Sequence, residues 1–180
     1  SDASTTLKGL NRMAPDPVSP EKLKEIAGRL GSDCPFFLHT GPMMAEGRGE
    51  ILTPVTLNLE GLFLVILHPG IQIPTAEAYR GVKPVIPGRH LVNLINEPVN
   101  QWKELIGNDF EFPVFQKYPE LAEIKQELYG SGALYASMSG SGSSLYGLFS
   151  SLPSLPEDLA RLVIWKGPAG LPQAPVDGPE

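Results

Sequence analysis

At 180 residues, the chain is long enough for one ordinary domain, or for a small domain with part of a neighbouring one. Hydrophobic residues make up 42% and charged residues 19%, and the net charge of −6 excludes a general nucleic-acid binder, which needs a basic face. The single cysteine, Cys34, excludes an internal disulfide, and the three histidines have no zinc-ligand spacing.

Two features predict the cellular location. No apolar run approaches the roughly 20 residues of a membrane span, and the N-terminus has neither the basic start nor the apolar core of a signal peptide. We therefore expect a soluble, cytoplasmic protein that binds neither membranes nor nucleic acids. The opening SDASTTLKGLNRM has no initiator methionine, and Leu7 and Leu10 already have helical spacing, which indicates a fragment of a longer protein.

The first third of the chain predicts two helices followed by short strands. Residues 2–12 form the first helix, and the segment 11–20 is a turn-rich linker. The second helix follows Ser19, a plausible N-cap, with Pro20 at its first position and Gly31 at its end. Short strands are expected over 35–39, 42–47 and 49–55, separated by Gly-rich turns.

The remainder alternates between helices and strands. The apolar stretch GLFLVILHPG (61–70) predicts a central strand covered on both faces. We expect short helical pieces near 75–79 and 99–106, a strong helix over 119–130, and strands over 133–139 and 143–150 joined by a tight GSGS turn. A last helix (156–162), a strand (163–167) and a loose Gly/Pro-rich tail complete an α+β sandwich.

One stretch suits the binding of phosphate. In SMSGSGSSLYG (137–147), small residues let the backbone turn sharply and bring its N–H groups close to an anion. The pattern is neither a Walker loop nor a dinucleotide fingerprint. On the motif alone, a Gly-rich hairpin turn remains the more common interpretation.

Asp33 is the only charged residue in LGSDCPFFL (30–38). Its side chain could cap the turn before Pro35, or it could accept a proton from a substrate hydroxyl, shielded by the apolar residues that follow. Local sequence favours the cap by about two to one, because acids at turns are far more common than catalytic bases.

Three further positions have both a structural and a functional interpretation. Arg48, between glycines, could face an anion or lie in a solvated turn. Thr75 could cap a short helix whose N-terminus offers N–H groups to an anion. The acids of GNDFE (107–111) fit no metal loop, and a turn is the better prediction.

Taken in order, these stretches resemble the 4-diphosphocytidyl-2-C-methyl-D-erythritol kinases, a family in the superfamily of galactokinase, homoserine kinase, mevalonate kinase and phosphomevalonate kinase. The resemblance runs from Ser1 to about Phe149. Besides an opening that is similar to Ser-Ser-Asp-Ala, it rests on LGSDCPFFL, EGRGEILTPV, PGIQIPTAEAY, NDFE and MSGSGSSLYGLF. No single motif is specific, but their order and approximate spacing are.

The resemblance implies a role for several residues. Asp33 matches the catalytic aspartate of a Gly-Ala-Asp-Val-Pro-Phe-Phe type stretch, which reverses the local preference for a cap. Ser1 matches the end of the phosphate loop, and Thr75 matches a threonine near the ligand. The implied phosphate-binding residues of the Gly-rich hairpin are Ser139, Gly140, Ser141 and Gly142. ATP and Mg²⁺ are the implied cofactors.

The resemblance also implies a domain organisation. A remnant of an N-terminal kinase domain (1–55) precedes a C-terminal ferredoxin-like αβ sandwich (56–166) and the tail (167–180). The family's catalytic lysine and most of its phosphate loop would precede Ser1, so we expect the chain to be inactive alone. Another kinase of the superfamily, or a non-catalytic anion-binding α+β module, are the alternatives. The oligomeric state stays open.

Overall fold

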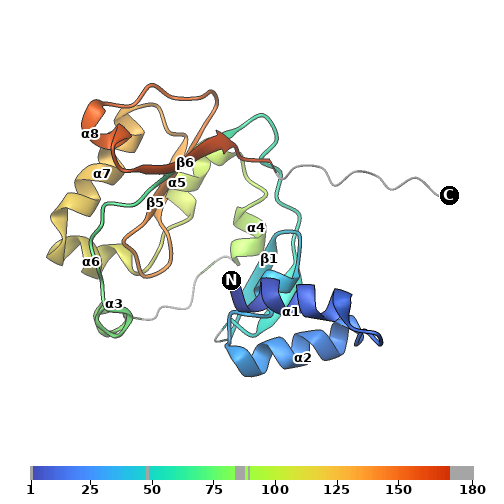
Figure 1. The fold of residues 1–180 in the computed structure, drawn as a ribbon. Coiled ribbons are helices and arrows are strands. Elements are labelled where there is room, and N and C mark those ends of the chain that lie inside the picture. The colour runs from blue at the N-terminus through green and yellow to red at the C-terminus, as the bar shows by residue number, and fades with distance from the viewer. Residues whose placement is uncertain (1, 48, 84–87, 89, 171–180) are drawn as a thin grey trace. The chain divides into compact units, whose positions relative to one another are not determined.

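In its described residues, the first unit of the chain, Ser1–Leu57, contains two α-helices and a two-stranded sheet (Figure 1). The computed structural model describes residues 2–47, 49–83, 88 and 90–170. Helices α1 (Asp2–Met13) and α2 (Pro20–Leu30) confirm the predicted pair. As predicted, Ser19 caps α2, its side chain accepting a hydrogen bond from the N–H of Lys22 at 3.2 Å.

The predicted strand over 35–39 is wrong. Residues Phe36–Leu38 form a short 3-10 helix, η1, because Pro35 adopts a helical conformation and local hydrogen bonds run from Leu38 N–H to Pro35 O and from His39 N–H to Phe36 O. The other two strands are present as β1 (Met43–Glu46) and β2 (Ile51–Pro54), which pair antiparallel.

The second unit, Asn58–Glu180, contains a four-stranded antiparallel sheet in the order β4-β5-β3-β6. Its strands are β3 (Phe63–Leu67), β4 (Tyr135–Met138), β5 (Leu145–Phe149) and β6 (Val163–Pro168). Helical segments lie between β3 and β4, and again between β5 and β6, while β4 and β5 form a hairpin. This is the split βαββαβ arrangement of a ferredoxin-like sandwich, which confirms the predicted fold class.

The segments between the strands are mostly short helices. Between β3 and β4 they are α3 (Thr75–Gly81), α4 (Leu91–Leu94), η2 (Val99–Gln101), α5 (Trp102–Leu105), α6 (Glu111–Lys117) and α7 (Pro119–Gly130). Helix α8 (Glu157–Ala160) precedes β6. Helix α6 was missed, because Pro113 marked this stretch as broken although proline is tolerated in a first helical turn.

The core of the second unit lies against one face of the sheet. Strand β3 contributes Val65 and Leu67, both fully buried, and Ile66 between them is only half-buried. The strand is therefore central, as predicted, but only one of its faces is fully covered. The core residues from the other elements are Ala78, Val114, Leu121, Leu128, Ala136, Met138, Leu145, Phe149 and Leu159.

The end of the sheet also differs from the prediction. Pro168, expected in the loose tail, belongs to β6 and pairs with Phe63, next to Gly167, which ends the predicted strand and pairs with Leu64. Residues 171–180 of the predicted tail lie outside the described residues. No helix in the described part of the chain is long and apolar enough to cross a membrane.

Candidate functional site

The Gly-rich turn lies at the end of the β4–β5 hairpin. The Ser139 N–H donates to Ser144 O at 2.8 Å, and the Gly142 N–H donates to Ser139 O at 3.0 Å. Within the described residues, the N–H groups of Gly140 and Ser141 donate to no backbone carbonyl. Two donors of the turn are therefore available to a ligand, as an anion-binding turn requires.

Positive φ angles explain why glycines occupy this turn. Gly140 has φ +54° and Gly142 has φ +90°. A side chain at Gly142 would also collide with its surroundings, since a Cβ atom there would lie 2.8 Å from Met138 Sδ and 2.9 Å from Ile73 Cδ1. The turn thus packs directly against the loop that leads from β3 to α3.

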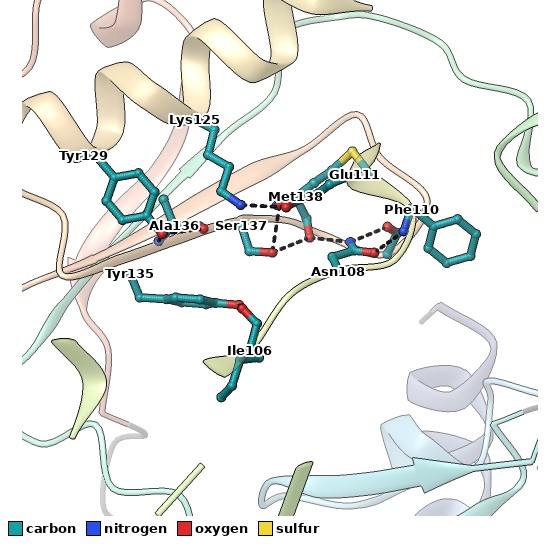
Figure 2. A network of polar contacts seen from close by, with 11 residues as sticks. Ile106, Asn108, Phe110, Glu111, Lys125, Tyr129, Tyr135, Ala136, Ser137 and Met138 are labelled. Carbon is teal, nitrogen blue, oxygen red and sulfur yellow. Dashed lines mark hydrogen bonds and ion pairs between the residues drawn. The ribbon is translucent and has the colours of Figure 1, made fainter. Parts of the chain in front are cut away.

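Strand β4 is an edge strand whose outward backbone groups are bonded by side chains (Figure 2). The Tyr129 hydroxyl accepts from the Ala136 N–H and donates to the Ala136 carbonyl, each at 3.2 Å. At Met138, the N–H donates to Glu111 Oε1 at 2.8 Å, and the carbonyl accepts from Asn108 Nδ2 at 2.8 Å. Side chains thereby replace the neighbouring strand that this edge lacks.

Glu111 lies at the centre of this network. Its Oε1 also accepts from the Ser137 hydroxyl at 3.1 Å, and its Oε2 forms an ion pair with Lys125 Nζ at 2.6 Å (Figure 2). The two charged side chains are only 12% and 19% exposed, so the ion pair is largely removed from water. Both carboxylate oxygens are bonded, as burial of a charge demands.

Asn108 connects the network to the Gly-rich turn. Its Nδ2 donates to the carbonyls of Met138 and Gly140, each at 2.8 Å, and its Oδ1 accepts from the Phe110 N–H at 2.9 Å (Figure 2). The motif NDFE, which was predicted to be a turn, therefore has two residues that contact the hairpin.

The region also contains tyrosines whose ionisation is suppressed. Burial is the main cause that raises the pKa of Tyr129, Tyr135 and Tyr146. Tyr135 makes edge-to-face contacts with Trp102 and with Tyr146. These phenols stay neutral at physiological pH and act as hydrogen-bonding groups.

Asp33 lies in the first unit, in a turn closed by a hydrogen bond from Cys34 N–H to Gly31 O at 3.1 Å. Its side chain is exposed and accepts from the Ser32 hydroxyl at 3.1 Å. The adjacent helix η1 has Pro35 at its N-cap and no side-chain cap, so Asp33 does not cap it. Phe36 and Phe37, expected to shield the carboxylate, are 40% and 46% exposed.

Helix α1 holds the loop that carries Asp33. The buried Ser4 hydroxyl donates to Cys34 O, and Lys8 Nζ donates to Phe37 O, both at 2.8 Å. The tip of the β1–β2 hairpin also approaches, because a Cβ atom at Gly49 would lie 3.6 Å from Asp33 Oδ1. Two residues that follow Asp33 in this loop are thus bonded to α1.

The remaining predicted site residues have different outcomes. Thr75 is exposed and is the first residue of α3; its predicted role as the N-cap is wrong, because Pro74 holds that position. The loop before it does contact the Gly-rich turn, where the Ser143 hydroxyl donates to Ile71 O. Ser1 and Arg48 lie outside the described residues.

The sequence predicts no metal site of the protein's own. In the part of the chain that the structure describes, no three histidine, cysteine or carboxylate side chains lie close enough to hold a metal ion.

Comparisons with known proteins show which families the chain resembles. The family of GHMP kinase C-terminal domains matches residues 91–163. The 4-diphosphocytidyl-2-C-methyl-D-erythritol kinase of Bacteroides fragilis is 48% identical over 149 residues, which are 83% of this chain and 54% of the relative. That of Azobacteroides pseudotrichonymphae is 49% identical over 150 residues, 83% and 56% of the two chains. The chain therefore resembles the GHMP kinases, whose C-terminal domain matches its residues 91–163.

A solved structure extends this likeness to three dimensions. A crystal structure of 4-(cytidine 5'-diphospho)-2C-methyl-D-erythritol kinase superposes with a TM-score of 0.66 at 33% identity, covering 82% of this chain and 54% of that one. The chain spans about half the length of the relatives it matches.

The structure adds residues that sequence reasoning missed. Asn108, Glu111 and Tyr129 bond the edge of β4, and Asn108 also reaches the Gly-rich turn. The available signal was NDFE itself, which contributed to the resemblance but received no role.

Proposed function

We propose that the chain carries the general base and a phosphate-binding turn of an ATP-dependent kinase. The acceptor is the 2-hydroxyl of 4-diphosphocytidyl-2-C-methyl-D-erythritol, and the reaction is a step of non-mevalonate isoprenoid biosynthesis. The identity of 48% over 149 residues to a relative named for this activity is the observation that carries the proposal.

The second unit supplies the phosphate-binding turn in this proposal. The N–H groups in the segment from Ser139 to Gly142 bind oxygens of the nucleotide phosphates, because clustered amide dipoles favour negative charge without adding a cation. Mg²⁺ enters with ATP as part of the substrate. Thr75, near the loop that contacts the turn, faces the acceptor. Ser1 is assigned to the end of the phosphate loop by the resemblance alone.

The first unit supplies the base. Asp33 accepts the proton of the attacking hydroxyl as the γ-phosphate is transferred. The fixed loop that carries Asp33 supports this role, since a base must be held within hydrogen-bonding reach of the proton that it removes. Soluble nucleotide substrates are consistent with a cytoplasmic location.

The test uses a hybrid enzyme. The chain is joined to the part of the Bacteroides fragilis relative that it does not cover, and ADP release is measured with MgATP and the diphosphocytidyl acceptor. We expect turnover by the hybrid and none by the 180-residue chain alone. A hybrid that folds, binds MgATP and phosphorylates homoserine or mevalonate instead would refute the proposed acceptor.

The base is tested by Asp33→Asn in the hybrid. Loss of a general base is expected to lower kcat by about 10²–10⁴-fold while leaving the affinity for MgATP nearly unchanged. Asp16→Asn, another acid of the first unit whose side chain is exposed, serves as the matched control. A wild-type kcat in Asp33→Asn would return this residue to a structural role.

A further inference from the structure

The amide group of Asn108 reaches both the strand and the turn of the β4–β5 hairpin. Its NH₂ group faces two carbonyls, those of Met138 and Gly140, each at 2.8 Å. Only the NH₂ side of the amide can face two acceptors, so its orientation is fixed by its surroundings. The amide oxygen is used at the other end, where it accepts from the Phe110 N–H.

The bond to Gly140 fixes the plane of a peptide group. The C=O of Gly140 and the N–H of Ser141 belong to the same trans peptide and therefore point in opposite directions. Because Asn108 holds the carbonyl, the Ser141 N–H is directed away from Asn108. Ser141 is one of the residues whose N–H donates to no backbone carbonyl in the described chain.

Free rotation of this peptide would oppose the binding of an anion. Gly140 has φ +54° and no heavy atom within 4 Å of the position of a Cβ, so no packing contact is present at that position. Turned over, the peptide would present its carbonyl oxygen to a phosphate in place of its N–H. A donor that is already oriented needs no reorganisation when the ligand arrives.

Asn108 is itself held in place by the network behind it. The Glu111 N–H donates to Asn108 O at 2.9 Å, and Glu111 bonds the N–H of Met138, whose carbonyl Asn108 bonds. The ion pair with Lys125 holds the Glu111 carboxylate from its other side. These bonds hold the Asn108 amide in place at the start of α6.

We infer that Asn108 is a positioning residue, which orients the Ser141 N–H toward the phosphates of the nucleotide. The inference rests on the proposed function, in which the Gly-rich turn binds those phosphates. It assigns to the Asn of NDFE a role that neither the motif nor the comparisons supply.

Two variants separate this role from local support of α6. Asn108→Asp keeps an oxygen for the Phe110 N–H but loses both donors to the hairpin, whereas Asn108→Ala loses all three bonds. Asn96→Asp is the control, because Asn96 donates only to Val92 O within its own segment. Raised salt screens the added charge of the Asp variants.

The first measurement is a titration of the ¹⁵N-labelled chain with MgATP, followed at the Ser141 amide. We expect a shift of this signal in the wild type and in Asn96→Asp, and an affinity about tenfold lower in both Asn108 variants, the effect of losing hydrogen bonds of ordinary strength. In the hybrid enzyme, KM for ATP should rise by the same factor while KM for the acceptor stays unchanged.

Each outcome decides between the two claims. If MgATP does not shift the Ser141 amide signal of the wild type, the proposed function is contradicted. A wild-type response that both Asn108 variants retain contradicts the inference alone. A response lost in Asn108→Ala but retained in Asn108→Asp would limit Asn108 to the start of α6. If Asn108→Ala fails to fold, the affinity of Asn108→Asp for MgATP still tests the inference.

Discussion

The two glycines of the turn allow a steric effect to be separated from a backbone effect. Gly140 and Gly142 both have positive φ angles, +54° and +90°. Alanine at either position must adopt a left-handed conformation, which costs about 1–2 kcal/mol. Only at Gly142 does the added methyl group also meet neighbours below 3.0 Å, namely Met138 Sδ and Ile73 Cδ1. The two substitutions therefore share one cost and differ in the other.

The magnitudes follow from these contacts. Met138 is 2% exposed, and its backbone N–H and carbonyl are both bonded by side chains, so its thioether has little room to move. Overpacking of this kind costs about 1–3 kcal/mol. We expect Gly142→Ala to lower the free energy of unfolding by about 2–5 kcal/mol, and Gly140→Ala by about 1–2 kcal/mol.

Tryptophan fluorescence provides the assay. Both tryptophans of the chain, Trp102 and Trp165, belong to the second unit, so a urea titration followed by their emission reports the unfolding of that unit. The midpoint should fall further for Gly142→Ala, with the slope unchanged in both variants. Equal destabilisation by the two substitutions, or a larger loss for Gly140→Ala, would refute the packing described for the turn.

Two further predictions concern single side chains. Tyr129→Phe leaves the Ala136 N–H and carbonyl without their partner, which should lower the free energy of unfolding by about 1–3 kcal/mol; Tyr79→Phe, at an exposed tyrosine, should be neutral in the same urea titration. Hydrogen bonds from Lys117 and Tyr118 lower the pKa of Glu77 below its ordinary value of 4.5. The ionised Glu77 therefore stabilises the fold above pH 4.5, and this stabilisation is lost as the pH falls through the lowered pKa. The stability difference between wild type and Glu77→Gln should disappear in acid; a difference that persists there would contradict the ion pair.

Elements specified by adjacent residues were predictable from the sequence. Helix α2 follows from Ser19, Pro20 and its apolar face, and its start agrees with the prediction. The β4–β5 hairpin follows from two apolar runs around a turn of glycines and serines. In these cases, the cap, the turn and the strands depend on neighbours within a few residues.

Predictions failed where one local pattern fits two structures. The stretch after Asp33 reads as a strand by composition, yet its bonds close into a 3-10 turn at Pro35. The stretch after Asn108 contains a proline, which concealed α6. The contacts of NDFE were also beyond local rules, because Asn108 bonds carbonyls 30 and 32 residues away. The pairing of β4 with β5 determines which carbonyls of β4 point away from the sheet and are free for Asn108.

The edge of β4 shows why side chains suit this position better than another strand would. A neighbouring strand could bond the outward groups of Ala136 and Met138, which lie two residues apart as a ladder requires. It could not follow the chain to Gly140, whose φ of +54° takes the backbone out of the extended conformation. A rotatable amide has no such constraint, and Asn108 bonds the last outward carbonyl of the strand and a carbonyl of the turn together. Side-chain support therefore extends the rigidity of the sheet into the turn, as the proposed phosphate-binding role requires.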